Sequence, residues 1–282
     1  MHPAELGELE AFRDRYATAP EGVGARAEEI GGGLCLRLEA APTSAMFNRA
    51  LGLGLREPAT EEALEQVAAF FGDEIGWCVA LAPQARPSEL PSWLEHRGFV
   101  RGYGWAKFRR GTSDPPHVPT ELRIEPVGAD GADAFAETFV RGYGTPGFFR
   151  EWLARIPARE RWYCFVAFDC EAPAAAGALY AAGEVGWLGI AATLPEHRRK
   201  GGQGAILAAR IEAAAAAGCE VVVTETGEAL RDKPSSSYRN IIRAGFSEVY
   251  VRRITSAHPR RTPRASPSAA RGRRRRRPRA SR

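Results

Sequence analysis

The sequence predicts a mixed α+β fold built from two similar halves, which a short linker joins and a basic tail follows. Three observations support this. Strand-like and helix-like apolar patterns alternate along most of the 282 residues. Residues 111–120 contain three prolines and no apolar period, as expected of a linker. Each half ends in the same pattern of a helix, a Gly-Phe pair and a strand.

Helices and strands alternate in the first half, residues 1–110. Apolar spacing predicts helices at 6–17, 60–71 and 88–97 and strands at 34–40, 77–81 and 100–108, with a further apolar stretch at 46–55. Local chemistry sets the helix ends. Thr60 is a good N-cap, and Glu61 and Glu62 follow it in the first turn. Gly98 is a natural residue to end the last of these helices.

The second half, residues 121–255, begins a new series of elements. Strands are predicted at 122–127, 162–168, 175–181, 184–192, 220–226 and 246–254, and helices at 132–143, 147–155, 202–217 and 236–244. Gly98-Phe99 in the first half and Gly245-Phe246 here occupy the same place, with a tyrosine four residues after each phenylalanine. This predicts a duplication. The alternative is an unrelated α+β domain in the first half.

The net charge of +5 comes from residues 256–282, which hold eleven arginines and no acidic residue. The rest of the chain carries 28 basic and 34 acidic residues, a net charge of −6. Because the tail has almost no apolar residue larger than alanine, it cannot bury enough surface to fold, and we expect it to be disordered. It could bind nucleic acid or another anionic surface. The alternative is a solvated extension with no dedicated partner.

Compartment and metal content follow from what the sequence lacks. It contains no run of 18 uncharged apolar residues and no secretory leader at its beginning, so we expect no membrane span and a cytoplasmic protein. The five cysteines are scattered and match neither a CxxC nor a Cys/His zinc spacing. They read as small apolar residues, and we expect no metal site.

Residues 189–205 combine a strand, a basic glycine-rich loop and the beginning of a helix. Glycines let a backbone approach a ligand, a helix N-terminus carries partial positive charge, and Arg198, Arg199 and Lys200 add full charges. This chemistry suits a pyrophosphate. The Walker pattern is absent, and the loop lacks the third glycine of a dinucleotide fingerprint. The alternative is a basic turn into an alanine-rich helix.

The segment Leu194-Pro195-Glu196-His197-Arg198-Arg199-Lys200-Gly201 resembles the signature loop of the GNAT-type N-acetyltransferases, Arg/Gln-x-x-Gly-x-Gly/Ala. Two registers fit: Arg199-x-x-Gly202-x-Gly204 and Arg198-x-x-Gly201-x-Gln203. The order of elements over residues 120–255 is also similar to this family. The resemblance implies two tandem GNAT-like domains, each a mixed, mostly antiparallel sheet flanked by helices. It also implies transfer of an acetyl group from acetyl-CoA to a primary amine of a small molecule.

Site residues follow from the resemblance, position by position. The pyrophosphate would lie on the loop, the pantetheine arm along the end of the preceding strand, and the helix with Ser237 and Asn240 beside the cofactor. The expected cofactor-binding residues are Ile190, Ala191, Ala192, Arg198, Arg199, Lys200, Gly201, Gly202, Gln203, Gly204, Ala205 and Asn240. Asn240 as a simple surface amide is the alternative.

The catalytic groups depart from the family pattern. Many members place a tyrosine four residues before the glycine of Gly-Phe, where it protonates the leaving thiolate, but this position is Ile241. Tyr238 lies one turn earlier and is an alternative. The proposed base is Glu225, with Glu184 as a second candidate, and water alone is a third. The missing tyrosine favours a competing hypothesis, in which the protein is a non-catalytic acyl-CoA-binding or regulatory module.

The first half has acids where the loop would lie, in Leu55-Arg56-Glu57-Pro58-Ala59-Thr60-Glu61-Glu62. Because these acids would repel a pyrophosphate, we expect this half to be a degenerate GNAT-like domain.

Overall fold

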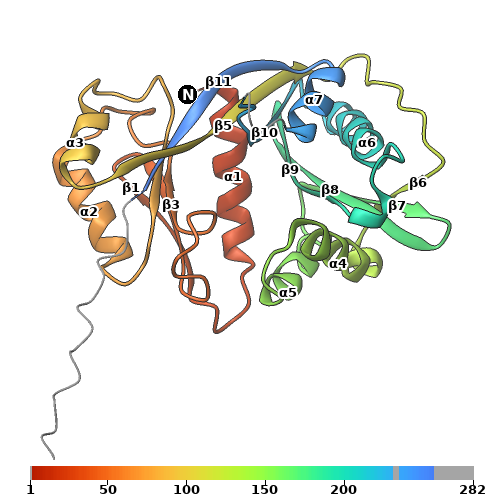
Figure 1. Cartoon of the computed structure of the whole chain (residues 1–282), viewed down its shortest axis with the longest axis horizontal. Coiled ribbons are helices and arrows are strands. Elements are labelled where there is room, and N and C mark those ends of the chain that lie inside the picture. Colours follow the sequence, from red (N-terminus) through yellow and green to blue (C-terminus); the bar gives the residue numbers. More distant parts are fainter. Residues whose placement is uncertain (1, 231–234, 257–282) are drawn as a thin grey trace, which may run out of the picture.

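The computed structural model describes residues 2–230 and 235–256. Its strands form one 11-stranded sheet in the order β1-β2-β3-β4-β11-β5-β10-β9-β8-β7-β6, which Figure 1 shows running through both halves. None of the described helices is long and apolar enough to cross a membrane. The predicted basic tail lies, except for Ser256, outside the described residues.

The first half contains α1 (Pro3–Ala17), β1 (Ala25–Ile30), β2 (Gly33–Leu38), β3 (Arg49–Leu51), α2 (Glu61–Phe71), β4 (Cys78–Leu81), α3 (Leu90–His96) and β5 (Val100–Gly111). Strands β3 and β4 are parallel, with α2 as the crossover between them. β1 pairs with β2 alone, at the edge of the sheet. The sequence patterns did not predict β1, because four of its six residues are exposed or charged and leave no apolar alternation to detect.

The second half contains β6 (Arg123–Val127), α4 (Ala132–Tyr143), α5 (Phe148–Ala154), β7 (Trp162–Asp169), β8 (Ala172–Ala182), β9 (Val185–Thr193), α6 (Gly202–Ala216), β10 (Val221–Gly227), α7 (Ser236–Arg243) and β11 (Ser247–Ser256). Strands β9 and β10 are parallel and joined by α6, as β3 and β4 are joined by α2. A helix and a final strand follow in both halves. The repeated order of elements therefore extends well beyond the shared Gly-Phe pair.

The last strands of the two halves exchange places. β11 ends the second half, yet it lies between β4 and β5 of the first half and is antiparallel to both. β5 ends the first half, yet its other edge pairs with β10 of the second half. The two halves are therefore joined through continuous backbone hydrogen bonding, which the linear sequence does not reveal.

Helices cover both faces of this sheet. One apolar core packs α1, α4 and α5 against residues such as Trp187 and Val223. Their neighbours Leu188 and Val222 point to the opposite face, where they pack with α6 and α7. A third core lies under α2 and α3 on that same opposite face. Because alternate strand residues serve opposite faces, β9 and β10 are apolar on both sides.

A group of buried charges, the central ion-pair cluster, joins both halves beneath α1. It consists of Glu5, Glu8, Lys107, Glu225 and Arg252. Lys107 donates to Glu8 at 2.9 Å and to Glu225 at 3.2 Å, while Arg252 donates to Glu5 at 3.1 Å and to Glu225 at 2.6 Å. Burial alone would raise the pKa of Glu8, but the charges of Arg252 and Lys107 hold that pKa well below its usual range.

Candidate functional site

The basic glycine-rich loop connects β9 to the beginning of α6. After a short 3₁₀ turn at Pro195–His197, Gly201 takes a left-handed conformation with φ of 82° and forms the N-cap. Its carbonyl accepts the first helical bond, from the Ala205 N–H at 3.0 Å. No side chain caps this helix, and its first turn contains no acid. The N–H groups of residues 202–204 therefore have no intrahelical acceptor and carry the partial positive charge of the helix N-terminus.

A cavity of about 910 Å³ opens at this helix end. Its lining comes from the linker, α4, β8, β9, the loop, α6 and α7: Pro116, His117, Val118, Pro119, Gly142, Tyr143, Ala176, Ala191, Ala192, Thr193, Arg198, Arg199, Gly201, Gly202, Gln203, Gly204, Ile206, Ser236, Ser237, Arg239, Asn240, Arg243 and Ala244. Four arginines are present, and the described lining contains no acidic residue. Such a surface favours an anion that carries several negative charges.

Helix α7 supplies a basic side of the cavity that the sequence motif did not predict. Asn240 donates from Nδ2 to Oε1 of Gln203 at 2.7 Å, which ties α7 to the first turn of α6. Arg239 and Arg243 of the same helix also line the cavity. They lie four residues apart, on one face of a helix. This spacing was the only sign of a basic helix face in the sequence, and it indicates part of the site only because the fold places α7 beside the loop.

The linker lies directly on the loop and forms one wall of the cavity. Thr120 donates from Oγ1 to the carbonyl of Lys200 at 2.7 Å. A Cβ atom on Gly201 would lie 2.9 Å from the carbonyl oxygen of Pro119, and one on Gly204 would lie 3.1 Å from Cγ1 of Val118. The absence of side chains at these two glycines therefore lets the linker pack closely against the loop.

One loop cation is turned away from the cavity. Lys200 does not line it, and its ammonium forms a short ion pair with Asp169 at the end of β7. The same carboxylate bonds Nδ1 of His197 at 2.8 Å. Hydrogen bonds from Lys200 and His197 lower the pKa of Asp169. This ion pair anchors the loop to β7, so Lys200 positions the loop.

The two parallel strands of the second half diverge near the cavity. Their pairing ends at Leu188 and Thr224, where Thr224 donates from Oγ1 to the Leu188 carbonyl at 2.8 Å. Ile190 follows with φ of 48°, at an irregularity where the β8–β9 register shifts. Beyond this point β9 continues to Thr193 without pairing to β10, and Ala191 and Ala192 line the cavity.

The predicted site residues divide into two groups. Those that line the cavity together are Ala191, Ala192, Arg198, Arg199, Gly201, Gly202, Gln203, Gly204 and Asn240. Those outside the lining are Ile190, Lys200, Ala205 and Glu225. Ile190 and Ala205 are buried, at 8% and 7% exposure, and Ile190 packs in the core with α1, α4 and α5.

The candidate catalytic groups lie in three different places. Glu225 belongs to the central ion-pair cluster, where its Oε2 accepts from both Lys107 and Arg252. Glu184 precedes β9, at the opposite end of this strand from the cavity. Tyr238 donates its hydroxyl proton to Glu248 at 2.6 Å and packs its ring on Phe108, so it does not line the cavity.

In the first half, α2 corresponds to α6, and side chains cap its N-terminus. Thr60 caps α2, since its hydroxyl accepts from the Ala63 N–H at 3.0 Å. Glu61 and Glu62 occupy the first turn, and Glu61 pairs with Arg97 at 2.9 Å. These side chains cap the helix end and surround it with negative charge, so this end does not favour an anion.

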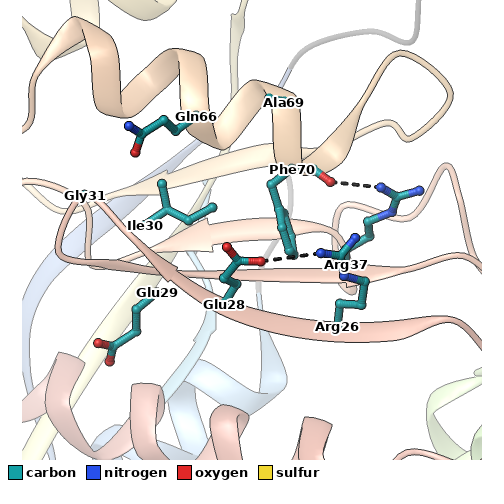
Figure 2. A pocket seen from close by; sticks show the side chains of 9 residues that line it. All are labelled: Arg26, Glu28, Glu29, Ile30, Gly31, Arg37, Gln66, Ala69 and Phe70. Carbon is teal, nitrogen blue, oxygen red and sulfur yellow. Dashed lines mark hydrogen bonds and ion pairs between the residues drawn. The ribbon is translucent and has the colours of Figure 1, made fainter.

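A second hollow, of about 480 Å³, lies between the β1–β2 hairpin and α2, as Figure 2 shows. It contains both signs of charge. Arg26 pairs with Glu28 at 3.5 Å, and Arg37 donates to the carbonyl of Phe70 at 2.9 Å. Because these groups already bind one another, we assign no ligand to this hollow.

Similarity to solved structures agrees with this architecture over most of the chain. A GCN5-related N-acetyltransferase from Kribbella flavida is 17% identical with a TM-score of 0.63, covering 89% of this chain and 95% of that one. One from Sphaerobacter thermophilus is 14% identical with a TM-score of 0.60, covering 88% and 84%. A tandem GNAT protein from the clavulanic acid biosynthesis pathway is 14% identical with a TM-score of 0.59, covering 90% and 93%.

The fold is that of a tandem GNAT protein. The predicted α+β class and the predicted two-part GNAT-like organisation are thus confirmed. No family model and no curated protein sequence matches the chain. At these identities the GNAT similarity concerns the fold, and the activity has to be argued from the site itself.

Proposed function

We propose that the chain transfers an acetyl group from acetyl-CoA to a primary amine of a small molecule. The observation that supports this best is the cavity at an uncapped helix N-terminus, with four arginines and no acid in its described lining. Coenzyme A carries a pyrophosphate and a further phosphate, so its charge fits this lining. When bound, acetyl-CoA supplies the thioester acyl group.

The chain's own residues divide the work of binding. The N–H groups of residues 202–204 and the guanidinium groups of Arg198 and Arg199 would hold the pyrophosphate. Arg239 and Arg243 add charge from α7. Gly201 is the loop glycine with positive φ, so the backbone requirement for glycine falls there and favours the register Arg198-x-x-Gly201-x-Gln203.

The acyl end of the ligand would lie along the free end of β9, at Ala191 and Ala192. Its unpaired edge offers backbone groups to an extended pantetheine arm, since β10 has diverged there. Glu225 stays our proposed base. Because it lies outside the cavity lining, it would take the ammonium proton of the amine through water.

A competing function is a binding module without turnover. Ile241, where many GNAT proteins have their acid, is 5% exposed and packs in the core, which favours this alternative. Calorimetric titration with CoA and thiol release from acetyl-CoA over an amine panel separate the two. Binding without release on any amine supports the module, and absence of CoA binding contradicts both.

A matched pair of variants makes the binding experiment specific. Replacing Arg198 and Arg199 by glutamine should abolish CoA binding, because both guanidinium groups line the cavity. Arg123→Gln, on the edge strand β6 and outside the lining, should leave binding unchanged.

A further inference from the structure

Tyr143 is the last residue of α4 and lies where the cavity meets the free end of β9. The neighbouring Gly142 is pressed against that strand. A Cβ on Gly142 would lie 3.0 Å from Cβ of Ala192 and 3.3 Å from the carbonyl of Thr193. This close packing fixes the end of α4 beside β9. Tyr143 and Ala192 therefore line the cavity together.

The ring of Tyr143 is held while its hydroxyl stays accessible. The ring stacks on Phe139, with centroids 5.2 Å apart and planes 11° from parallel. The residue is 45% exposed, and within the described chain no hydrogen-bond partner occupies its hydroxyl. Burial of the ring, and after it the charge of Glu225, raise the pKa of Tyr143, with Arg49 opposing them. The phenol therefore stays protonated at neutral pH and can donate a proton.

The other candidate proton donors lie elsewhere. Among the described lining residues, His117 also bears a titratable proton, but it belongs to the linker, whose next residues touch Gly201 and Gly204 at the phosphate end. Tyr238 already donates to Glu248, and Ile241 has no proton to give. The cavity thus has one phenol, and it lies at the end where the strands diverge.

We propose that Tyr143 is a catalytic residue whose hydroxyl donates its proton to the leaving sulfur. This rests on the function proposed above. The amine nitrogen bonds to the acyl carbon, the carbon–sulfur bond breaks, and its electron pair goes to sulfur. Sulfur takes the Tyr143 proton, and the nitrogen loses its proton through water to Glu225. Proton exchange with water then returns that proton from Glu225 to the phenol. Helix α7 has Ile241 at the position of the usual acid, and α4 supplies the proton donor from the other face of the sheet.

Tyr143→Phe removes only the hydroxyl and keeps the ring on Phe139, so the fold should survive. We expect kcat for acetyl transfer to fall about 100-fold, as for loss of a general acid, while the dissociation constant for acetyl-CoA rises no more than about fivefold. Tyr238→Phe is the matched control and should retain kcat. Retention of kcat in Tyr143→Phe, or an equal loss of kcat in both variants, would overturn the proposal.

A second readout does not depend on turnover. Calorimetry compares CoA with desulfo-CoA, which lacks the sulfur. In the wild type we expect CoA to bind about fivefold more tightly, the worth of one hydrogen bond to sulfur. In Tyr143→Phe this ratio should approach one, and in Tyr238→Phe it should not change.

The outcomes separate this inference from the function on which it rests. If CoA binds and the ratio is the same in Tyr143→Phe as in the wild type, Tyr143 does not contact the sulfur and the inference fails alone. If neither CoA nor desulfo-CoA binds to the wild type, the proposed function fails and the inference falls with it.

Discussion

Glu8→Gln tests whether the central ion-pair cluster holds the two halves together. The side chain of Glu8 is fully buried and bonds Lys107 of the first half's last strand and Arg252 of the second half's last strand. Glutamine has nearly the same shape but no charge. The variant therefore leaves two buried cations with less compensating negative charge, while the surrounding apolar packing is kept.

The expected cost follows from the burial of all three groups. Removing one partner of a buried ion pair costs about 3–5 kcal/mol, because the remaining charge stays in a low-dielectric site. Glu225 and Glu5 still compensate part of that charge, which favours the lower end of the range. At about 2–4 °C of melting temperature per kcal/mol, the variant should melt about 10 °C below the wild type.

The assay is thermal and urea unfolding at pH 7, with Glu10→Gln as the control on the same helix. Glu10 is half-exposed and lies 3.8 Å from Arg161, so its loss should change stability by less than about 0.5 kcal/mol. Equal stabilities of Glu8→Gln and Glu10→Gln would refute the reasoning, since they would show that the cluster contributes no more than a surface pair.

The stability difference between the wild type and Glu8→Gln should also depend on pH in a definite direction. Because the folded pKa of Glu8 is depressed, its stabilisation is complete above the unfolded pKa of about 4.3 and is lost as the pH falls further. The stability difference between wild type and Glu8→Gln should therefore be largest at neutral pH and shrink below about pH 4. A difference that grows on acidification would contradict the ion-pair assignment.

Three further predictions concern the loop, α7 and the first half. Gly201→Ala should lower the free energy of unfolding by about 1–2 kcal/mol and weaken CoA binding at least about tenfold. The control Gly218→Ala, also at φ of 82° but with open space around it, should leave CoA binding unchanged. Arg243→Gln should weaken CoA binding about tenfold, and less so at high salt, as titrations at two ionic strengths would show. Thr60→Ala should lower the unfolding free energy by about 1 kcal/mol without changing CoA affinity. Unchanged affinity in the loop or α7 variant, or changed affinity in Thr60→Ala, would contradict these assignments.

Local chemistry explains what the sequence predicted well. The basic loop that leads into a helix, from Arg198 to Gly204, could be predicted because its glycines, its positive charges and the helix start are adjacent in the chain. Thr60 and its two following acids likewise identify a capped helix end from three neighbouring residues. In both cases the physical requirement is satisfied within one turn, so no knowledge of the tertiary fold is needed.

The features that could not be predicted from the sequence depend on residues that are far apart in the chain. Arg239 and Arg243 acquire a role only because α7 lies beside the loop, and Tyr143 only because α4 ends against β9. Glu225 is separated by 118 residues from its partner Lys107, so its ion pairs could not be read from any local pattern. Whether it acts as a base stays a prediction.

The exchange of β5 and β11 has a consequence for how the chain is made on the ribosome. Synthesis proceeds from the N-terminus, so β4 and β5 emerge long before β11, which must lie between them. Until residues 247–256 have left the exit tunnel, both strands present an unpaired edge of the kind that promotes aggregation. We therefore expect nascent chains that end before residue 247 to bind chaperones and resist native folding, while release of the last strand completes both halves in one cooperative step.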